Sequence, residues 1–114
     1  MNDIEKKALG FLGFAVRARA AAIGVPLVCE AMKKAANGAK NKPVIVLEAA
    51  DTSANTHKRL TDKAAYYRVP LQQLSLNAAS LGATVGKSAA VGAVAVLDAQ
   101  LAKAIAALYG IHFN

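Results

Sequence analysis

The chain has 114 residues, of which 55% are hydrophobic, and this length predicts a single domain with one core, spanning residues 1–114. No apolar run approaches the roughly 20 residues of a membrane span, and the polar first residues are unlike a secretory signal, so we expect a cytoplasmic protein with no membrane contact. Fourteen Lys and Arg against seven Asp and Glu give a charge of +7, which favours nucleic acid as the partner because basic surfaces displace counterions from phosphate backbones.

In the N-terminal half, helical periodicity alternates with short extended runs. Asn2 is predicted to cap the first helix, and Glu5 stands three residues on, as in a capping box. Proline suits a first helical turn, so a second helix is predicted to open at Pro26. A β-branched run bounded by turn signals predicts a buried strand over Val44–Leu47. The other elements expected here are a helix from Asp3 to Val16, a turn or short strand over Arg17–Gly24, a helix end at Asn37-Gly38, and a basic loop at Lys40–Lys42.

The C-terminal half repeats this alternation. Asp51, Thr52 and Ser53 offer caps for a third helix, which Pro70 stops. The continuous apolar run Val91–Leu97 predicts a strand that is covered on both faces. The remaining elements expected are an end of the third helix near Arg68, a strand over Leu71–Leu74, a short helix over Ala78–Val85 that stops at Gly86, and a last helix that Asp98 caps and Gly110 terminates. The alternation as a whole predicts an α/β fold, with a central sheet between helices.

The residue types of enzyme and metal sites are present but are not arranged as sites. His57 and His112 have no Cys, His or carboxylate partner at a metal-ligand spacing, so we expect no metal and interpret both as solvated or capping residues. No Gly-x-Ser-x-Gly motif presents a nucleophile. Cys29 is alone and lies in a predicted helix, which indicates a buried structural thiol. We therefore expect neither catalysis nor a cofactor.

The segment from Gly82 to Ser88 ends like a phosphate-binding loop but does not match one. That loop needs a glycine at position 81, which is Leu81 here. It also needs a strand before it and a helix after it, so that the helix N-terminus faces the phosphates. Here the predicted order is reversed, which argues against nucleotide binding. No Gly-x-Gly-x-x-Gly motif follows any predicted strand either.

Several stretches, in their order and spacing from about residue 4 to 109, resemble one known family. They are Leu9 to Ala18, Gly24, Ser53 to Lys63, Tyr66 to Pro70 and Leu81 to Ser88. The family is the kink-turn RNA-binding family of ribosomal protein L-seven-Ae, with its L-thirty-e and gadd-forty-five-like members, and in particular its small bacterial ribosome-associated branch. The resemblance implies a three-layer α/β/α sandwich around a small mixed central sheet. It also implies binding of bent, structured RNA, in this case ribosomal RNA on the ribosome or on its assembly intermediates. Apart from the resemblance, nothing in the sequence demands more than a monomer, and we expect one.

The resemblance further implies two regions of RNA contact. One is the loop and first turns of the second helix, and the other is the loop before the last strand. A helix N-terminus offers N–H groups to phosphate, and small side chains from Ala89 to Val91 permit close approach to unstacked bases. The residues implied are Gly24, Val25, Pro26, Leu27, Lys33, Lys34, Gly86, Lys87, Ser88, Ala89 and Ala90, with Lys40 and Lys42 as further phosphate contacts.

The second helix departs from the family pattern at three positions. Many members have Asn, Glu and Lys where this chain has Pro26, Leu27 and Glu30, so the polar groups that read a kink-turn are absent. Leu27 is expected either to face the RNA or to pack at the edge of the core. The alternative function is a protein-interaction module of the same fold without specific RNA readout. Its mark would be an exposed apolar patch around Val25, Pro26 and Leu27.

Overall fold

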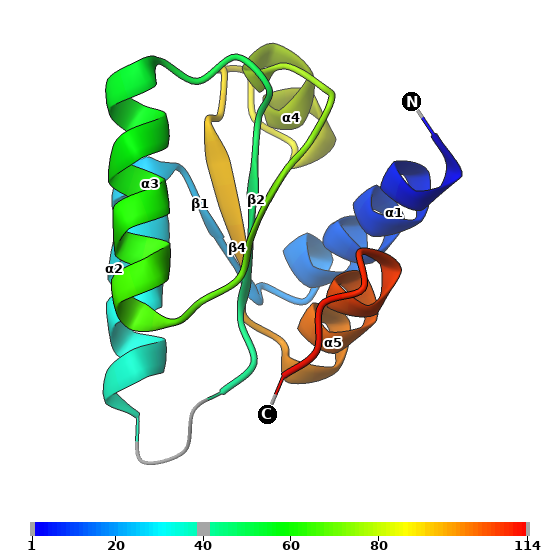
Figure 1. Cartoon of the computed structure of the whole chain (residues 1–114). Helices are drawn as coiled ribbons and strands as arrows, with labels where there is room; N and C mark the ends of the chain where they lie inside the picture. The colour runs from blue at the N-terminus through cyan, green and yellow to red at the C-terminus, as the bar shows by residue number, and fades with distance from the viewer. Residues whose placement is uncertain (1, 39–41, 114) are drawn as a thin grey trace.

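Helices and strands alternate along the chain in the computed structural model, which describes residues 2–38 and 42–113 (Figure 1). The helices are α1 (Asp3–Arg17), α2 (Val25–Asn37), α3 (Ala54–Tyr67), α4 (Ala78–Thr84) and α5 (Ala99–Leu108). The strands are β1 (Ala21–Ile23), β2 (Ile45–Glu48), β3 (Leu71–Gln73) and β4 (Ala93–Val96). The order of elements is the predicted one. Within the described ranges, no helix has the length and apolar content of a membrane span.

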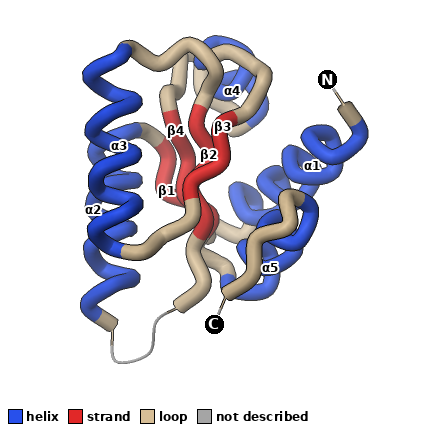
Figure 2. Tube along the Cα trace, in the orientation of Figure 1, coloured by secondary structure: helices blue, strands red, loops and turns tan. Residues whose placement is uncertain are grey.

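The four strands of the described residues form one mixed sheet in the order β1-β4-β2-β3 (Figure 2). β2 and β3 run parallel, and β4 runs antiparallel to both β1 and β2. Every residue of β2 and β4 is buried, as expected of apolar strands that are covered on both faces. β1 and β3, each only three residues long, form the edges.

Helices cover both faces of this sheet. α2 and α3 lie on one face and α1 and α5 on the other, while α4 packs at one end (Figures 1 and 2). Side chains alternate along β2, so that Ile45 and Leu47 join the core under α1 and α5, whereas Val46 joins the core under α2 and α3. The predicted three-layer α/β/α sandwich with a small mixed sheet is thereby confirmed.

The predicted N-caps hold at three helices. Asn2 Oδ1 accepts the Glu5 N–H at 2.8 Å, Ser53 Oγ accepts the Thr56 N–H at 3.1 Å, and Asp98 Oδ1 accepts the Leu101 N–H at 2.9 Å. The other predicted caps for α3 have different partners. Asp51 Oδ1 accepts the N–H of the first residue of α4 at 2.7 Å, and Thr52 bonds to a glutamate on β2. These two residues therefore connect elements rather than cap a helix.

The capping-box prediction for Glu5 is wrong. Its buried carboxylate accepts hydrogen bonds from the Ser75 hydroxyl at 2.5 Å, the Ser75 N–H at 2.9 Å and the Leu76 N–H at 3.2 Å. Burial by itself raises the pKa of this carboxyl, but the hydrogen bonds outweigh burial and hold the pKa below its ordinary value. Glu5 thus ties the start of α1 to the loop after β3. Burial, and then the charge of Glu5, raise the pKa of Tyr109.

The sheet has two ends, which are named here for what they carry. At the loop end, β1, β2 and β3 finish and β4 begins, so the segments 49–53, 74–77 and 86–92 gather there around the starts of α2 and α3. At the opposite end, the basic end, β1, β2 and β3 begin and β4 finishes. That end receives the last turns of α2 and α3 and the start of β1. Exposed cationic side chains gather toward it: Arg17, Arg19, Lys33, Lys34, Lys42 and Arg68.

Candidate nucleic-acid interface

The chain turns from β1 into α2 at Gly24. Its φ of +98° and ψ of 149° belong to a region that only glycine enters easily. The Gly24 N–H donates to the carbonyl of Ala93 at 2.9 Å, which fixes the turn to the start of β4. No side chain among the described residues caps α2. The first turn of α2 therefore presents free backbone N–H groups at the loop end, except at Pro26, which has none.

The loop 86–91, which leads to β4, is held against α4. The Lys87 N–H donates to the carbonyl of Gly82 at 2.8 Å, and the Val91 N–H donates to that of the first residue of α4 at 2.9 Å. A Cβ on Gly82 would overlap the carbonyl oxygen of Ala89, so glycine is required for this close packing. Residues 86–90 are exposed and Val91 is buried. The loop thus presents a small, fixed surface that is anchored by one core side chain.

Gly92 lies where the two predicted contact regions meet. A Cβ built on Gly92 would have a methyl group of Val25 and a methyl group of Thr52 as neighbours, each at 3.4 Å. The chain therefore passes between the first turn of α2 and the segment before α3. In this way the structure brings Gly24–Leu27 and the loop 86–91 together at the loop end.

Leu27 is a surface residue. Its side chain is 53% exposed, so the interpretation that it packs at the edge of the core is wrong. Leu27, Glu30 and Lys34 line one side of a groove of about 500 Å³, which also runs along the edge strand β1 and past Leu97. Pro26 is exposed and Val25 is half-buried. The exposed apolar patch named for the protein-interaction alternative is therefore present.

The lysine contacts predicted on α2 and in the loop after it lie apart from the loop end. Lys33 and Lys34 are in the last turns of α2, about 10 Å along the helix axis from Leu27 at 1.5 Å per residue. Lys42 is exposed and lies toward the basic end, whereas Lys40 falls outside the described residues. Within the loop 86–91 the one cationic side chain is Lys87. The candidate interface therefore joins an apolar region at the loop end to a cationic region farther along α2.

A hydrogen-bonded cluster beside this interface was not predicted. Glu48, the last residue of β2, is fully buried, and its Oε2 accepts a hydrogen bond from the Thr52 hydroxyl at 2.5 Å. Nδ1 of His57 lies 2.9 Å from both carboxylate oxygens. In the tautomer that carries the hydrogen on Nδ1, the ring donates to the carboxylate and Nε2 is left for another partner. The ring is half-exposed, in agreement with the interpretation of His57 as a solvated residue, but its buried acidic partner was not predicted.

A sequence signal for this cluster was available. Glu48 directly continues the apolar run of β2, and a glutamate inside a buried strand is almost always paired with another polar group. A buried carboxylate needs hydrogen-bond donors nearby, and Thr52 and His57 are among the polar side chains that follow within nine residues. Across the described residues, no group of three or more His, Cys, Asp and Glu side chains is placed to hold a metal ion. Cys29 is buried, as predicted.

Known proteins resemble this chain in sequence and in structure. No family model matches it. RNA-binding protein YlxQ of Bacillus subtilis (strain 168) is 38% identical over 97 residues, which cover 85% of this chain and 89% of that protein. A protein with unknown function from Bacillus halodurans C superimposes with a TM-score of 0.76 at 30% identity, over 91% of this chain and 97% of the other. The Giardia lamblia 15.5kD RNA binding protein shares the fold, with a TM-score of 0.73 at 18% identity, over 96% and 88%.

Proposed function

Because this chain belongs to the family of RNA-binding protein YlxQ, we propose that it is itself an RNA-binding protein that recognises bent, kink-turn-like structured RNA. It acts without catalysis in the cytoplasm, as a monomer, on ribosomal RNA or on a ribosome assembly intermediate. The observation that carries the proposal is the junction at Gly92, where the uncapped start of α2 meets the exposed loop 86–91.

The two sides of this junction suit different parts of a bent RNA. Free N–H groups and the positive end of the helix dipole at α2 attract a phosphate. The loop offers Ala89 and Ala90, which are exposed and small, so bases that a bend has unstacked can approach the backbone closely. Because the loop is already held against α4, little ordering entropy is lost when RNA binds.

The readout proposed here differs from that of many family members. Leu27 stands where they have Glu, and Glu30 where they have Lys, so backbone donors and apolar contact replace side-chain hydrogen bonds. Phosphate contacts come from Lys33 and Lys34, at the far end of α2. Such an interface recognises the shape of the bend more than the identity of its bases.

The test is a titration of a kink-turn RNA and of a straight duplex of equal length, each over a salt series. Tighter binding of the bent RNA is expected. The variant Ala90→Glu places a carboxylate on the exposed loop and should weaken binding of the bent RNA by roughly tenfold or more, because like charges at an interface cost several kcal/mol. Ala107→Glu, on the exposed side of α5, is the control and should leave the affinity for the bent RNA unchanged. Equal effects of the two variants would contradict the proposed site.

The second candidate is a protein-interaction module that has kept the fold without specific RNA readout. It is favoured by the groove of about 500 Å³, in which Leu27 is 53% and Leu97 is 37% exposed beside an edge strand. A protein segment could pair with β1 there and bury both leucines. Absence of salt-dependent binding to either RNA would favour this candidate over the first.

A further inference from the structure

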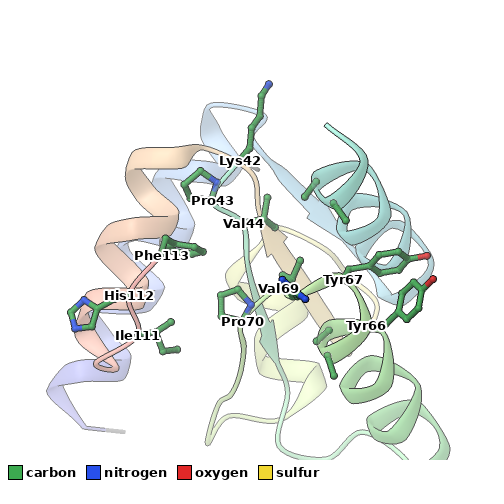
Figure 3. Close-up of a pocket in the computed structure, with 15 residues that line it drawn as sticks. Lys42, Pro43, Val44, Tyr66, Tyr67, Val69, Pro70, Ile111, His112 and Phe113 are labelled. Carbon is green, nitrogen blue, oxygen red and sulfur yellow. The ribbon is translucent and has the colours of Figure 1, made fainter. Parts of the chain in front are cut away.

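A second groove lies at the basic end, away from the junction at Gly92. It has a volume of about 780 Å³ and is open to solvent along one side. Figure 3 shows Tyr66 and Tyr67 on one side of it and the C-terminal segment 111–113 on the other. Val44 and Pro70 lie between them (Figure 3). The groove is thus formed by segments that are far apart in the sequence and meet only in the folded chain.

One aromatic side chain of this groove is largely exposed to solvent. Tyr66 is 80% exposed, although it is a large hydrophobic residue. Its ring meets that of Tyr67 edge to face, with the centroids 5.0 Å apart and the planes at 84°, so the edge contact leaves ring faces uncovered. Phe113 is half-buried on the opposite side. Exposed ring faces of this kind are platforms on which nucleobases stack.

The charge of the groove complements a phosphate backbone. Arg68 and Lys42, both exposed, line it together with His112. None of the described residues that line it carries a carboxylate. Cationic side chains next to uncovered aromatic faces, without acidic groups, form the combination by which proteins hold single-stranded nucleic acid.

We propose that this groove binds an unpaired stretch of RNA, with a base stacked on Tyr66 and the backbone held by Arg68 and Lys42. The site is separate from the one proposed at the loop end, because the 14 residues of α3 place about 20 Å between them. An RNA that bends at the loop end and continues as a single strand can occupy both sites. The second site does not depend on recognition of the bend.

The test is binding of a fluorescent single-stranded oligouridine of about eight nucleotides to the full chain. Tyr66→Ala should weaken this binding by roughly tenfold, the loss of one stacked base, while Tyr66→Phe should bind as the parent does. Arg68→Asn removes the charge, and asparagine tolerates the left-handed conformation of this position, with φ of 57°. It should lower the slope of log affinity against log salt by about 0.7.

Two control variants separate this site from other effects. Phe14→Ala removes another exposed aromatic side chain, 56% exposed with Arg17 4.8 Å from its ring centre, and should leave oligouridine binding unchanged. Ala90→Glu should weaken binding of the bent RNA but leave binding of oligouridine unchanged. If the parent chain binds oligouridine but not the bent RNA, the function proposed for the loop end is contradicted and the site proposed in this groove is not.

Three results would overturn the assignment of this groove to RNA. One is the absence of oligouridine binding by the parent chain. Another is an oligouridine affinity that Tyr66→Ala and Arg68→Asn leave unchanged while circular dichroism shows that both variants are folded. The third is equally tight, Tyr66-dependent binding of an oligoglutamate peptide, which has charge but no bases and would make the groove a peptide site.

Discussion

At the scale of single residues, Glu48 is the more deeply buried of the two buried glutamates in the described structure. A charge without partners inside a protein is strongly unfavourable. Here the Thr52 hydroxyl and the His57 ring both contact the carboxylate, at 2.5 Å and 2.9 Å. Since Thr52 also touches the position of a Cβ on Gly92, this cluster fixes the segment before α3 against the candidate interface.

The Thr52→Val variant tests this cluster. Valine keeps the methyl group near Gly92 but removes the hydroxyl, so Oε2 of Glu48 loses one of its two hydrogen-bond partners and keeps His57. We expect the free energy of unfolding to fall by about 1–3 kcal/mol, measured by urea denaturation. Thr61→Val, an exposed position on α3, should change stability by less than about 0.5 kcal/mol. In a Glu48→Leu background Thr52→Val should cost less, and an equal cost in both backgrounds would show that the two side chains are not coupled.

Glu5 gives a second prediction at this scale, for the dependence of stability on pH. Its pKa is lowered in the folded chain, so its stabilising effect is complete above the unfolded pKa of about 4.3 and is lost as pH falls through the folded pKa. Glu5→Gln should therefore lower the free energy of unfolding by about 1–3 kcal/mol near pH 7. The difference between parent and variant should shrink below about pH 4, and a difference independent of pH would contradict this.

At the scale of elements, the junction of β1 with α2 decides where the helix start lies. The chain reverses within one residue, Gly24, while its N–H bonds to Ala93 at 2.9 Å. The helix can then begin at once, beside the loop that precedes β4. A side chain at Gly24 would strain the backbone at φ +98° and would move the first turn of α2 relative to that loop.

A matched pair of glycine substitutions tests this junction. Gly24→Ala should lower the free energy of unfolding by about 1–3 kcal/mol, because alanine is strained at this φ and ψ. Gly10→Ala, within α1 at an exposed site with no atom near a new Cβ, should raise it by about 0.5–1 kcal/mol through helix propensity. Both changes restrict the unfolded chain alike, so thermal unfolding of the two variants isolates the folded-state strain. If Gly24→Ala raised the free energy of unfolding, the strain expected of alanine at this position would be contradicted.

At the scale of the whole molecule, charge and shape are divided between two ends. The loop end has small exposed side chains and helix starts, with Lys58, Arg59 and Lys87 as its exposed cations, whereas a larger group of exposed Arg and Lys side chains lies toward the basic end. An RNA that also reaches the basic end meets more of these cations than one that contacts the loop end alone. We therefore expect bound RNA to extend along α2 toward the basic end.

Neutralising two lysines on α2 tests this extension. The double variant Lys33→Gln and Lys34→Gln should weaken binding of the bent RNA and reduce the slope of log affinity against log salt by about two, one for each lost contact. The control is Lys6→Gln with Lys103→Gln, exposed lysines on α1 and α5, on the opposite face of the sheet (Figure 1). If the control and the test variant change the slope equally, the cations act only through net charge.

The sequence by itself determined the order of elements, the three capping residues and the three-layer fold. These depend on local signals: helical spacing, short side chains that bond to N–H groups three residues on, and strands apolar throughout because both faces are covered. Sequence pattern also named the two regions that meet at Gly92, through a resemblance to a known family. The sequence could not decide whether Leu27 is exposed or buried. Helical spacing places it beside the buried stripe of α2 but does not tell whether that side of the helix is covered.

Only the tertiary structure decided the partners of residues distant along the chain. Glu5 and Ser75 are 70 residues apart, and the groove at the basic end joins the end of α3 to the segment 111–113. Such pairings follow from how the helices pack on the sheet, which local propensity does not encode. The side chain of a polar residue near a helix start bonds to whichever partners packing brings close in space. For the Glu5 carboxylate these partners come from the loop after β3 and not from its own helix.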